Sequence, residues 1–138
     1  MKTLLLVEDN PDEAELTTRA FRKHDPLLTL ELAEDGALAL ARLRTDGPLP
    51  DLVLLDLKLP KVEGLEVLRQ LRRDERTRLL PVVVLTSSVE EQDVLESYRS
   101  GCNSYVRKPV SYEEFLQTAR DLGVYWLRLN HPPPGLPG

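Results

Sequence analysis

Four short apolar runs, each followed by residues that can handle a phosphoryl group or a divalent cation, constrain the fold of this chain more than any other feature. The runs cover residues 4–7, 52–55, 82–85 and 105–106. A strand that is apolar at every position is buried on both faces, which is typical of parallel sheets covered by helices. The pattern therefore predicts an α/β protein in which the carboxyl ends of neighbouring strands share one rim.

Helix signals fill the segments between these runs. Asn10 is placed to cap the first helix, Pro11 suits its first position, and Glu13 stands where a capping box places a carboxylate. Further helices are expected over residues 37–44, after Gly64, and over residues 89–99 and 111–129. With one more strand at residues 29–33, the βα unit occurs five times. Right-handed crossovers then favour a doubly wound five-stranded parallel sheet of order 2-1-3-4-5, in a three-layer sandwich.

The length of 138 residues suits one domain. We expect residues 1–129 to form it, with an extended last helix, and residues 130–138 to form a Pro- and Gly-rich tail. Residues 125–129 add large apolar side chains to that helix. Two outcomes are open for this extension: it packs on its own domain, or it forms an interface with a second copy of the chain.

Charge and composition argue against several protein classes. With 18 basic and 23 acidic residues, the net charge of -5 disfavours binding to nucleic acid, and we interpret the arginines between residues 69 and 78 as the solvated end of a helix and its loop. No apolar stretch approaches the roughly 20 residues of a membrane span. The first apolar run turns acidic too early for a signal peptide. The lone Cys102 permits no internal disulfide, which favours a cytoplasmic location.

Three carboxylates are expected to meet at the rim. In the predicted order the first and third strands are neighbours, which brings Glu8, Asp9 and Asp56 together. Two carboxylates about 4 Å apart repel by roughly 4 kcal/mol at an effective dielectric near 20, so a cation must lie among them. Oxygen ligands favour a hard ion, and Mg2+ fits better than zinc. His24 and His131 lack the spacing of a metal site, and we expect both at the surface.

The same rim carries groups suited to phosphoryl chemistry. Asp56 stands alone at its strand end and can attack phosphorus to form an aspartyl phosphate. Lys108 can supply positive charge to the phosphoryl oxygens, and the Thr86 hydroxyl can donate a hydrogen bond. Pro109 fixes the backbone after Lys108, and a cis bond there would aim the lysine over the rim. Singly, each residue has an ordinary explanation as a cap or a solvated charge; their convergence favours phosphoryl transfer.

These motifs resemble those of the receiver domains of two-component response regulators, over residues 2–123. The residues that carry the resemblance are Val7-Glu8-Asp9-Asn10, Leu55-Asp56-Leu57-Lys58-Leu59-Pro60 with Gly64, Leu85-Thr86-Ser87, and Tyr105-Val106-Arg107-Lys108-Pro109. The resemblance implies a flavodoxin-like (CheY-like) fold. It also implies a signalling phosphoprotein rather than an enzyme, with self-catalysed phosphoryl transfer and autodephosphorylation only.

The resemblance assigns roles around the metal. Asp56 would be the phosphoacceptor and would bind Mg2+ together with Asp9 and the main-chain carbonyl of Lys58. Glu8 would hold metal-bound water. The side chain of Lys58 departs from the neutral or amide groups often found at its position, and we hypothesise that its charge alters the lifetime of the phosphoryl group.

The resemblance also assigns a switch. Thr86 and Lys108 would contact the phosphoryl group, and Tyr105 would swing inward as Thr86 moves. The surface formed by the fourth helix, fifth strand and fifth helix would change with it and signal to a partner or dimer mate. The implied partner is a sensor histidine kinase. The apolar extension resembles that of stand-alone regulators of bacterial phytochromes, which implies a phytochrome kinase and a homodimer formed through the C-terminal face.

Two rival functions are weighed against this interpretation. A phosphohydrolase of the haloacid dehalogenase type also uses a strand-end aspartate and magnesium. Enzymes of that type carry the motif Asp-x-Asp, and here Lys58 occupies the place of the second carboxylate. A phosphate-independent binding module could keep the fold without the chemistry. The intact set of Asp9, Asp56, Thr86 and Lys108 argues against that degeneration.

Overall fold

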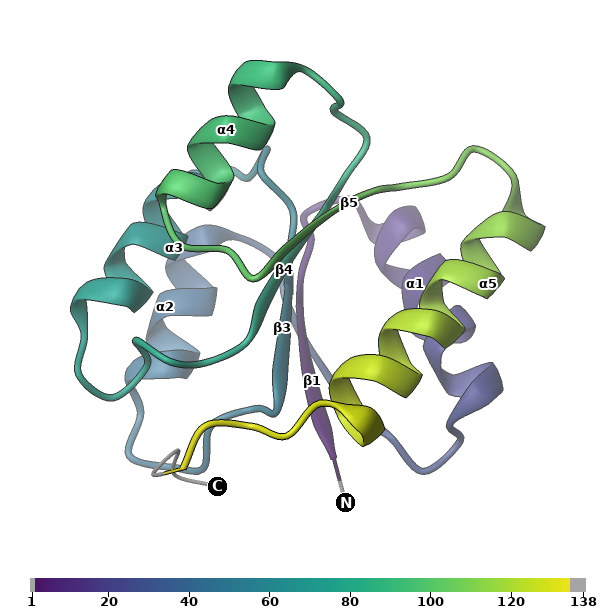
Figure 1. Cartoon of the computed structure of the whole chain (residues 1–138), viewed down its shortest axis with the longest axis horizontal. Coiled ribbons are helices and arrows are strands. Elements are labelled where there is room, and N and C mark those ends of the chain that lie inside the picture. The colour runs from purple at the N-terminus through teal and green to yellow at the C-terminus, as the bar shows by residue number, and fades with distance from the viewer. Residues whose placement is uncertain (1, 135–138) are drawn as a thin grey trace.

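The apolar runs form the strands of one parallel sheet. The computed structural model describes residues 2–134. The strands are β1 (Thr3–Val7), β2 (Thr29–Ala33), β3 (Leu52–Leu55), β4 (Val82–Thr86) and β5 (Ser104–Arg107). They are hydrogen-bonded in the order β2-β1-β3-β4-β5, with every pair parallel (Figure 1). The predicted doubly wound five-stranded order is therefore confirmed.

Helices cover both faces of the sheet. They are α1 (Pro11–His24), α2 (Gly36–Arg44), α3 (Gly64–Arg73), α4 (Glu91–Arg99) and α5 (Tyr112–Val124). In Figure 1, α1 and α5 lie side by side on one face, while α2, α3 and α4 line the other, which completes the three-layer sandwich. The fourth helix begins at Glu91, slightly later than the predicted residue 89. Across residues 2–134, none of the helices combines the length and apolarity needed to cross a membrane.

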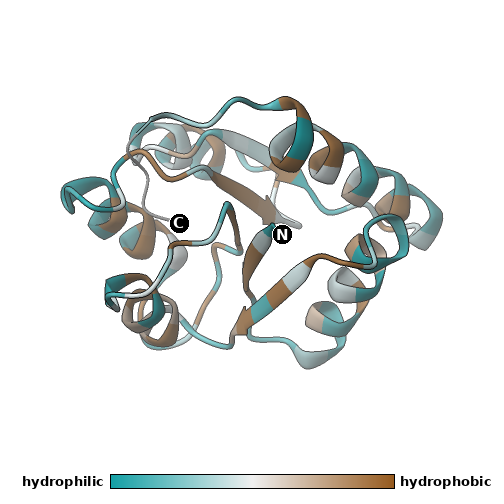
Figure 2. Cartoon of the chain, turned by 90° about the horizontal axis from the view of Figure 1, so that it is seen from below, coloured by the Kyte–Doolittle hydropathy of each residue, from teal (hydrophilic) through white to brown (hydrophobic). Residues whose placement is uncertain are grey.

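Each strand contributes to two hydrophobic cores, one on each face. In β1, Leu5 and Val7 belong to the core shared with α2 and α3, whereas Leu4 and Leu6 belong to the core shared with α1 and α5. The central strands are correspondingly hydrophobic in Figure 2. Fully burying a Leu or Val side chain contributes roughly 1.5–3 kcal/mol. The sheet is thus buried between its two helix layers, and this packing fixes the position of the strand ends at its carboxyl rim.

The first strand-to-helix turn is capped as predicted, but by one side chain only. Asn10 Oδ1 accepts hydrogen bonds from the backbone N–H groups of Asp12 at 2.9 Å and Glu13 at 3.2 Å. The reciprocal capping bond predicted for Glu13 is wrong, because the Asn10 N–H donates to Glu8 Oε2 at 3.3 Å. The Glu13 carboxylate is therefore free for another contact.

The last helix extends to the predicted residue but changes its geometry. After α5, a π-helical turn, η1 (Tyr125–Leu129), follows, and the Asn130 N–H donates to Tyr125 O at 2.6 Å. Leu127 is buried and Trp126 packs against the core of α1 and α5, whereas Tyr125 and Leu129 are 48% and 69% exposed. Part of the extension thus packs on its own domain and part remains at the surface. Residues 135–138 of the predicted tail lie outside the described residues, and the division at 129/130 stays a prediction.

The interpretation of the arginine run as solvated is wrong for two of its members. Arg72 donates hydrogen bonds to five acceptors in neighbouring loops: Thr77 O, Arg78 O, Leu80 O, Gly101 O and Asn103 Oδ1. Arg76 donates to the carbonyl oxygens of Leu43, Thr45 and Gly47 at the end of α2. These two side chains tie loops together at the edge of the molecule opposite the carboxyl rim.

Candidate functional site

The three predicted carboxylates meet at the carboxyl ends of β1 and β3. Glu8 and Asp56 follow residues that are paired in the sheet, Val7 with Leu55, and Asp9 comes next in the chain. One oxygen from each of Glu8, Asp9 and Asp56 lies within 4.8 Å of the other two. The predicted convergence is therefore observed, and an all-oxygen donor set suits a hard cation.

The burial of these carboxylates indicates how a cation would reach them. Asp9 is exposed and Asp56 is half-buried, whereas Glu8 is only 3% exposed. Burial raises the pKa of the Glu8 carboxyl, and the hydrogen bond from Lys108 partly offsets the rise. Asp9 and Asp56 can thus meet a solvated ion directly, and Mg2+, which keeps several of its waters, fits this donor set.

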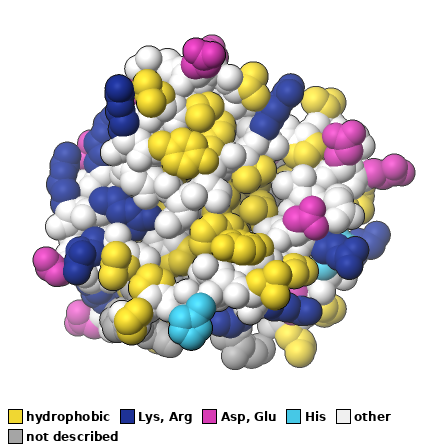
Figure 3. All heavy atoms as spheres, viewed as in Figure 1, with side chains coloured by type: hydrophobic (Ala, Val, Ile, Leu, Met, Phe, Trp, Pro, Cys, Tyr) yellow, Lys and Arg dark blue, Asp and Glu magenta, His cyan; other side chains and the backbone are white. Residues whose placement is uncertain are grey.

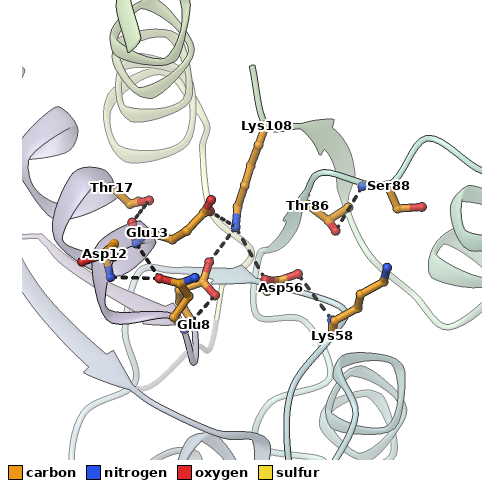
Figure 4. A network of polar contacts seen from close by, with 10 residues as sticks. Glu8, Asp12, Glu13, Thr17, Asp56, Lys58, Thr86, Ser88 and Lys108 are labelled. Carbon is orange, nitrogen blue, oxygen red and sulfur yellow. Dashed lines mark hydrogen bonds and ion pairs between the residues drawn. The ribbon is translucent and has the colours of Figure 1, made fainter. Parts of the chain in front are cut away.

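Lys108 supplies the positive charge of the site from the loop after β5. Its Nζ lies 2.6 Å from Glu8 Oε1, 2.7 Å from Glu13 Oε2 and 3.5 Å from Asp56 Oδ2 (Figure 4). Desolvation alone would lower the pKa of Lys108, but hydrogen bonds to Glu13 and Glu8 outweigh it and raise the pKa. The cis bond considered for Pro109 is not observed, since residues 2–134 contain no cis peptide bond. Lys108 therefore reaches over the rim from a trans-proline loop.

Glu13 belongs to this site although the sequence interpretation gave it only a capping role. It lies in the first turn of α1, and its side chain points to the Lys108 ammonium (Figure 4). Spacing along the chain gives no signal for this role, because α1 begins at Pro11 and the helical repeat therefore does not relate Glu13 to the carboxylates before it. A glutamate at this position can either cap the helix or bind a distant cation, and the sequence alone favours the cap.

The loop after Asp56 packs tightly against this residue and the start of α3. The Lys58 N–H donates weakly to Asp56 Oδ1 at 3.4 Å, while the Lys58 side chain is exposed. Gly64 N–H donates to Leu57 O at 3.0 Å, and a Cβ on Gly64 would lie 2.3 Å from the Asp56 carbonyl oxygen. Only glycine allows α3 to start this close to Asp56. The metal contact expected of the Lys58 carbonyl and the effect of its side chain on phosphoryl lifetime stay predictions.

Thr86 is the last residue of β4, the neighbour of β3, and Tyr105 lies within β5, the next strand along the sheet. Thr86 is buried, and its Oγ1 accepts a long hydrogen bond of 3.5 Å from the Ser88 N–H. Its carbonyl accepts the Lys108 N–H at 2.8 Å, which fixes the lysine loop to β4. Tyr105 is half-buried against the core of α2 and α3, and its hydroxyl donates to Ser88 O at 2.9 Å. Thr86 and Tyr105 thus both form a hydrogen bond with the backbone of Ser88 in the β4–α4 loop.

Comparison with known proteins places the chain among response regulators. Residues 4–120 match the response regulator receiver domain family. The chain is 46% identical to the probable methanogenesis regulatory protein FilR2 of Methanothrix harundinacea over 134 residues, which cover 94% of this chain and 86% of the relative.

Solved structures agree with that match. The phosphorylated cyanobacterial phytochrome response regulator RcpA superposes with a TM-score of 0.90 at 34% identity, over 96% of this chain and 98% of that one. The Mn2+-bound form of the response regulator Rcp1, which occurs in Synechocystis, gives a TM-score of 0.87 at 33% identity, over 96% and 99% of the two chains. Both similarities cover the strand ends that carry the site.

Proposed function

Because its residues 4–120 match the family directly, this chain belongs to the response regulator receiver domain family, and we propose that it accepts a phosphoryl group on Asp56 from a sensor histidine kinase. The observation that carries the proposal is the approach of Glu8, Asp9 and Asp56 beside the Lys108 ammonium. A carboxylate next to both a cation site and a lysine is suited to attack on phosphorus.

In the proposed reaction, one Asp56 carboxylate oxygen attacks the phosphorus atom of the donor. A bond forms between that oxygen and phosphorus, and the bond from phosphorus to the donor breaks, with its electron pair leaving on the donor. Lys108, 3.5 Å from Asp56 Oδ2, is near enough to move onto the transferred oxygens. Thr86 would donate its hydroxyl from the adjoining strand end. A magnesium ion held by Asp9 and Asp56 would neutralise charge on the phosphoryl oxygens.

The rival functions are separated from this one by what happens to phosphate. Incubation with acetyl phosphate and Mg2+, acid quenching and intact-mass measurement are expected to show one added phosphoryl group on the wild type and none on Asp56→Asn. A phosphohydrolase would instead release phosphate from many esters, and a phosphate-independent binding module would do neither. Absence of the adduct from the wild type after acid trapping would reject the proposal.

The signalling surface in our proposal is the α4-β5-α5 face. Figure 3 views this face and shows apolar side chains gathered over its middle. The half-buried Tyr105 donates its hydroxyl to Ser88 O in the β4–α4 loop, and the Ser88 N–H donates to Thr86, so a movement of Thr86 would reach Tyr105 through Ser88. Exposed apolar residues on α4 and α5, among them Leu95, Tyr98 and Tyr112, would form part of the contact with a partner.

We extend the proposal to partner and assembly. The likeness to the phytochrome response regulator RcpA supports a phytochrome kinase as the phosphoryl donor, with the exchange taking place in the cytoplasm. The exposed Tyr125 and Leu129 of η1 support a homodimer through the C-terminal face, because large apolar groups at the surface favour an interface. The acidic net charge of -5 supports a protein partner over nucleic acid.

Sedimentation velocity tests the dimer. The wild type is expected to sediment as a dimer, and Leu129→Glu as a monomer, because the change places a charge in the proposed interface. Leu38→Glu is the matched control, since Leu38 is 52% exposed on α2, away from η1. A monomeric wild type, or a monomeric Leu38→Glu variant, would contradict the assignment of the interface.

A further inference from the structure

Two glutamates hold Lys108, and they hold it closer than Asp56 does. The Lys108 Nζ donates to Glu8 Oε1 at 2.6 Å and to Glu13 Oε2 at 2.7 Å, whereas Asp56 Oδ2 lies 3.5 Å away. An ammonium group has three hydrogens to donate. Two of them are thus committed to partners other than the proposed phosphoacceptor (Figure 4).

The two glutamates differ in how easily they release the lysine. The side chain of Glu8 is 3% exposed, and that of Glu13 is 45% exposed. A buried carboxylate that loses its cation stays desolvated, but an exposed one is rehydrated by water. The bond from Lys108 to Glu13 is therefore the one that can be exchanged, while the bond to Glu8 persists.

Local structure fixes Glu13 in this position. Its backbone N–H is bound by the capping Asn10 side chain, and its carbonyl accepts the Thr17 hydroxyl at 2.9 Å. Both backbone polar groups of Glu13 are thereby hydrogen-bonded, which fixes its backbone in the first turn of α1. With its backbone fixed in this way, Glu13 has to order only its own side chain to reach Lys108.

We infer that Glu13 is a positioning residue that holds Lys108 in its resting place, so that a phosphoryl group on Asp56 must displace Glu13 to gain the lysine. This inference rests on the proposed function. A ligand shifts an equilibrium only by its difference in affinity for the two states. Because Glu13 stabilises only the state in which Lys108 is away from the phosphoryl group, it opposes the phosphorylated state and sets how strong the phosphoryl signal must be.

The test measures affinity for beryllofluoride, a phosphoryl analogue, in the presence of Mg2+. Glu13→Gln removes the charge that competes for Lys108 and keeps the length of the side chain. We expect it to bind beryllofluoride about fivefold more tightly than the wild type, which corresponds to about 1 kcal/mol. Fluorine NMR of the bound fluorides reports this affinity, and a residue with only a structural role in α1 would not tighten it.

Glu15→Gln is the matched control, because it removes the same charge from the same helix at an exposed position paired with Arg19. The affinity of Glu15→Gln for beryllofluoride is expected to stay within twofold of the wild-type affinity. A second variant, Glu13→Ala, should tighten binding in the same direction. The inference is overturned if Glu13→Gln binds no more tightly than the wild type, or if Glu15→Gln tightens binding equally. A wild type that binds no beryllofluoride would instead reject the proposed function itself.

Discussion

Lys108→Met is expected to lower the free energy of unfolding by about 3 kcal/mol at neutral pH, because it leaves the buried Glu8 carboxylate without its cation. The two groups lie 2.6 Å apart, and the Glu8 side chain is 3% exposed. Removing one partner of a buried ion pair costs roughly 3–5 kcal/mol, and we take the lower end because the second partner, Glu13, can be rehydrated. Urea denaturation of the metal-free proteins measures the difference.

This deficit is expected to shrink as the pH falls. In the wild type burial raises the pKa of Glu8, and Lys108 limits the rise. Without Lys108 the pKa of Glu8 rises further, so the folded variant binds a proton that the unfolded chain, with an ordinary value of 4.5, does not hold. The state that binds more protons gains stability on acidification. The free energy of unfolding of the variant should therefore fall below that of the wild type by least near the ordinary pKa of Glu8. The difference should be largest above the raised pKa of Glu8 in the folded variant.

Lys58→Met is the control for Lys108→Met, because it removes a lysine charge from an exposed side chain of the same rim. A surface change of this kind alters stability by about 0.5 kcal/mol or less. Added Mg2+ should narrow the deficit of Lys108→Met, since a bound cation stabilises the folded state and replaces the lost charge. Equal stability of the two variants would show that Lys108 does not compensate the carboxylates.

The meeting of distant residues at one rim could be predicted because it follows from strand order alone. Apolar strands, helical spacers and right-handed crossovers left few topologies, and each strand end then had a known neighbour. Asp56 was placed beside Asp9 in this way, and the structure brings their oxygens together. The positions of residues at strand ends can therefore be predicted from a sequence, because they follow from the order of the strands in the sheet.

What could not be predicted depends on which of several partners a flexible side chain takes. Glu13 fits a capping box by spacing, yet its carboxylate binds Lys108, because a charged hydrogen bond is stronger than a bond to a neutral N–H. The Lys108-Pro109 bond is trans, and the hydrogen bond from the Lys108 N–H to the Thr86 carbonyl fixes the loop that carries the lysine. For Glu13 a tertiary contact determined the outcome, and spacing along the chain contained no sign of it.

The arginine run shows the same limit for a structural residue. Alternating charges at residues 72–78 are typical of a solvated helix end, but Arg72 folds back beneath the loops before β4 and β5. Burial lowers the pKa of its guanidinium, which remains charged at physiological pH. The planar fork can bind several carbonyl groups at once, and no pattern in the sequence identifies those carbonyls.

Arg72→Ala is accordingly expected to lower the free energy of unfolding by about 3 kcal/mol, because hydrogen bonds to a charged group contribute about 1.5–3 kcal/mol each and several are lost, although water can replace part of them. The shortest are those to Leu80 O and Gly101 O, both at 2.8 Å. Thermal unfolding should shift down by about 10 °C. Arg72→Lys should recover less than half of the loss, since a single ammonium cannot span acceptors on separate loops.

Arg73→Ala provides the comparison, because the neighbouring arginine is 70% exposed and has only a long contact with Glu66 at 3.9 Å. Its effect should stay within about 0.5 kcal/mol. If Arg72→Ala unfolded at the same urea concentration as Arg73→Ala, the loops before β4 and β5 would not depend on the guanidinium. A large loss confined to Arg72 would show that the loops leading into β4 and β5 depend on one side chain, at the edge of the molecule opposite the carboxyl rim.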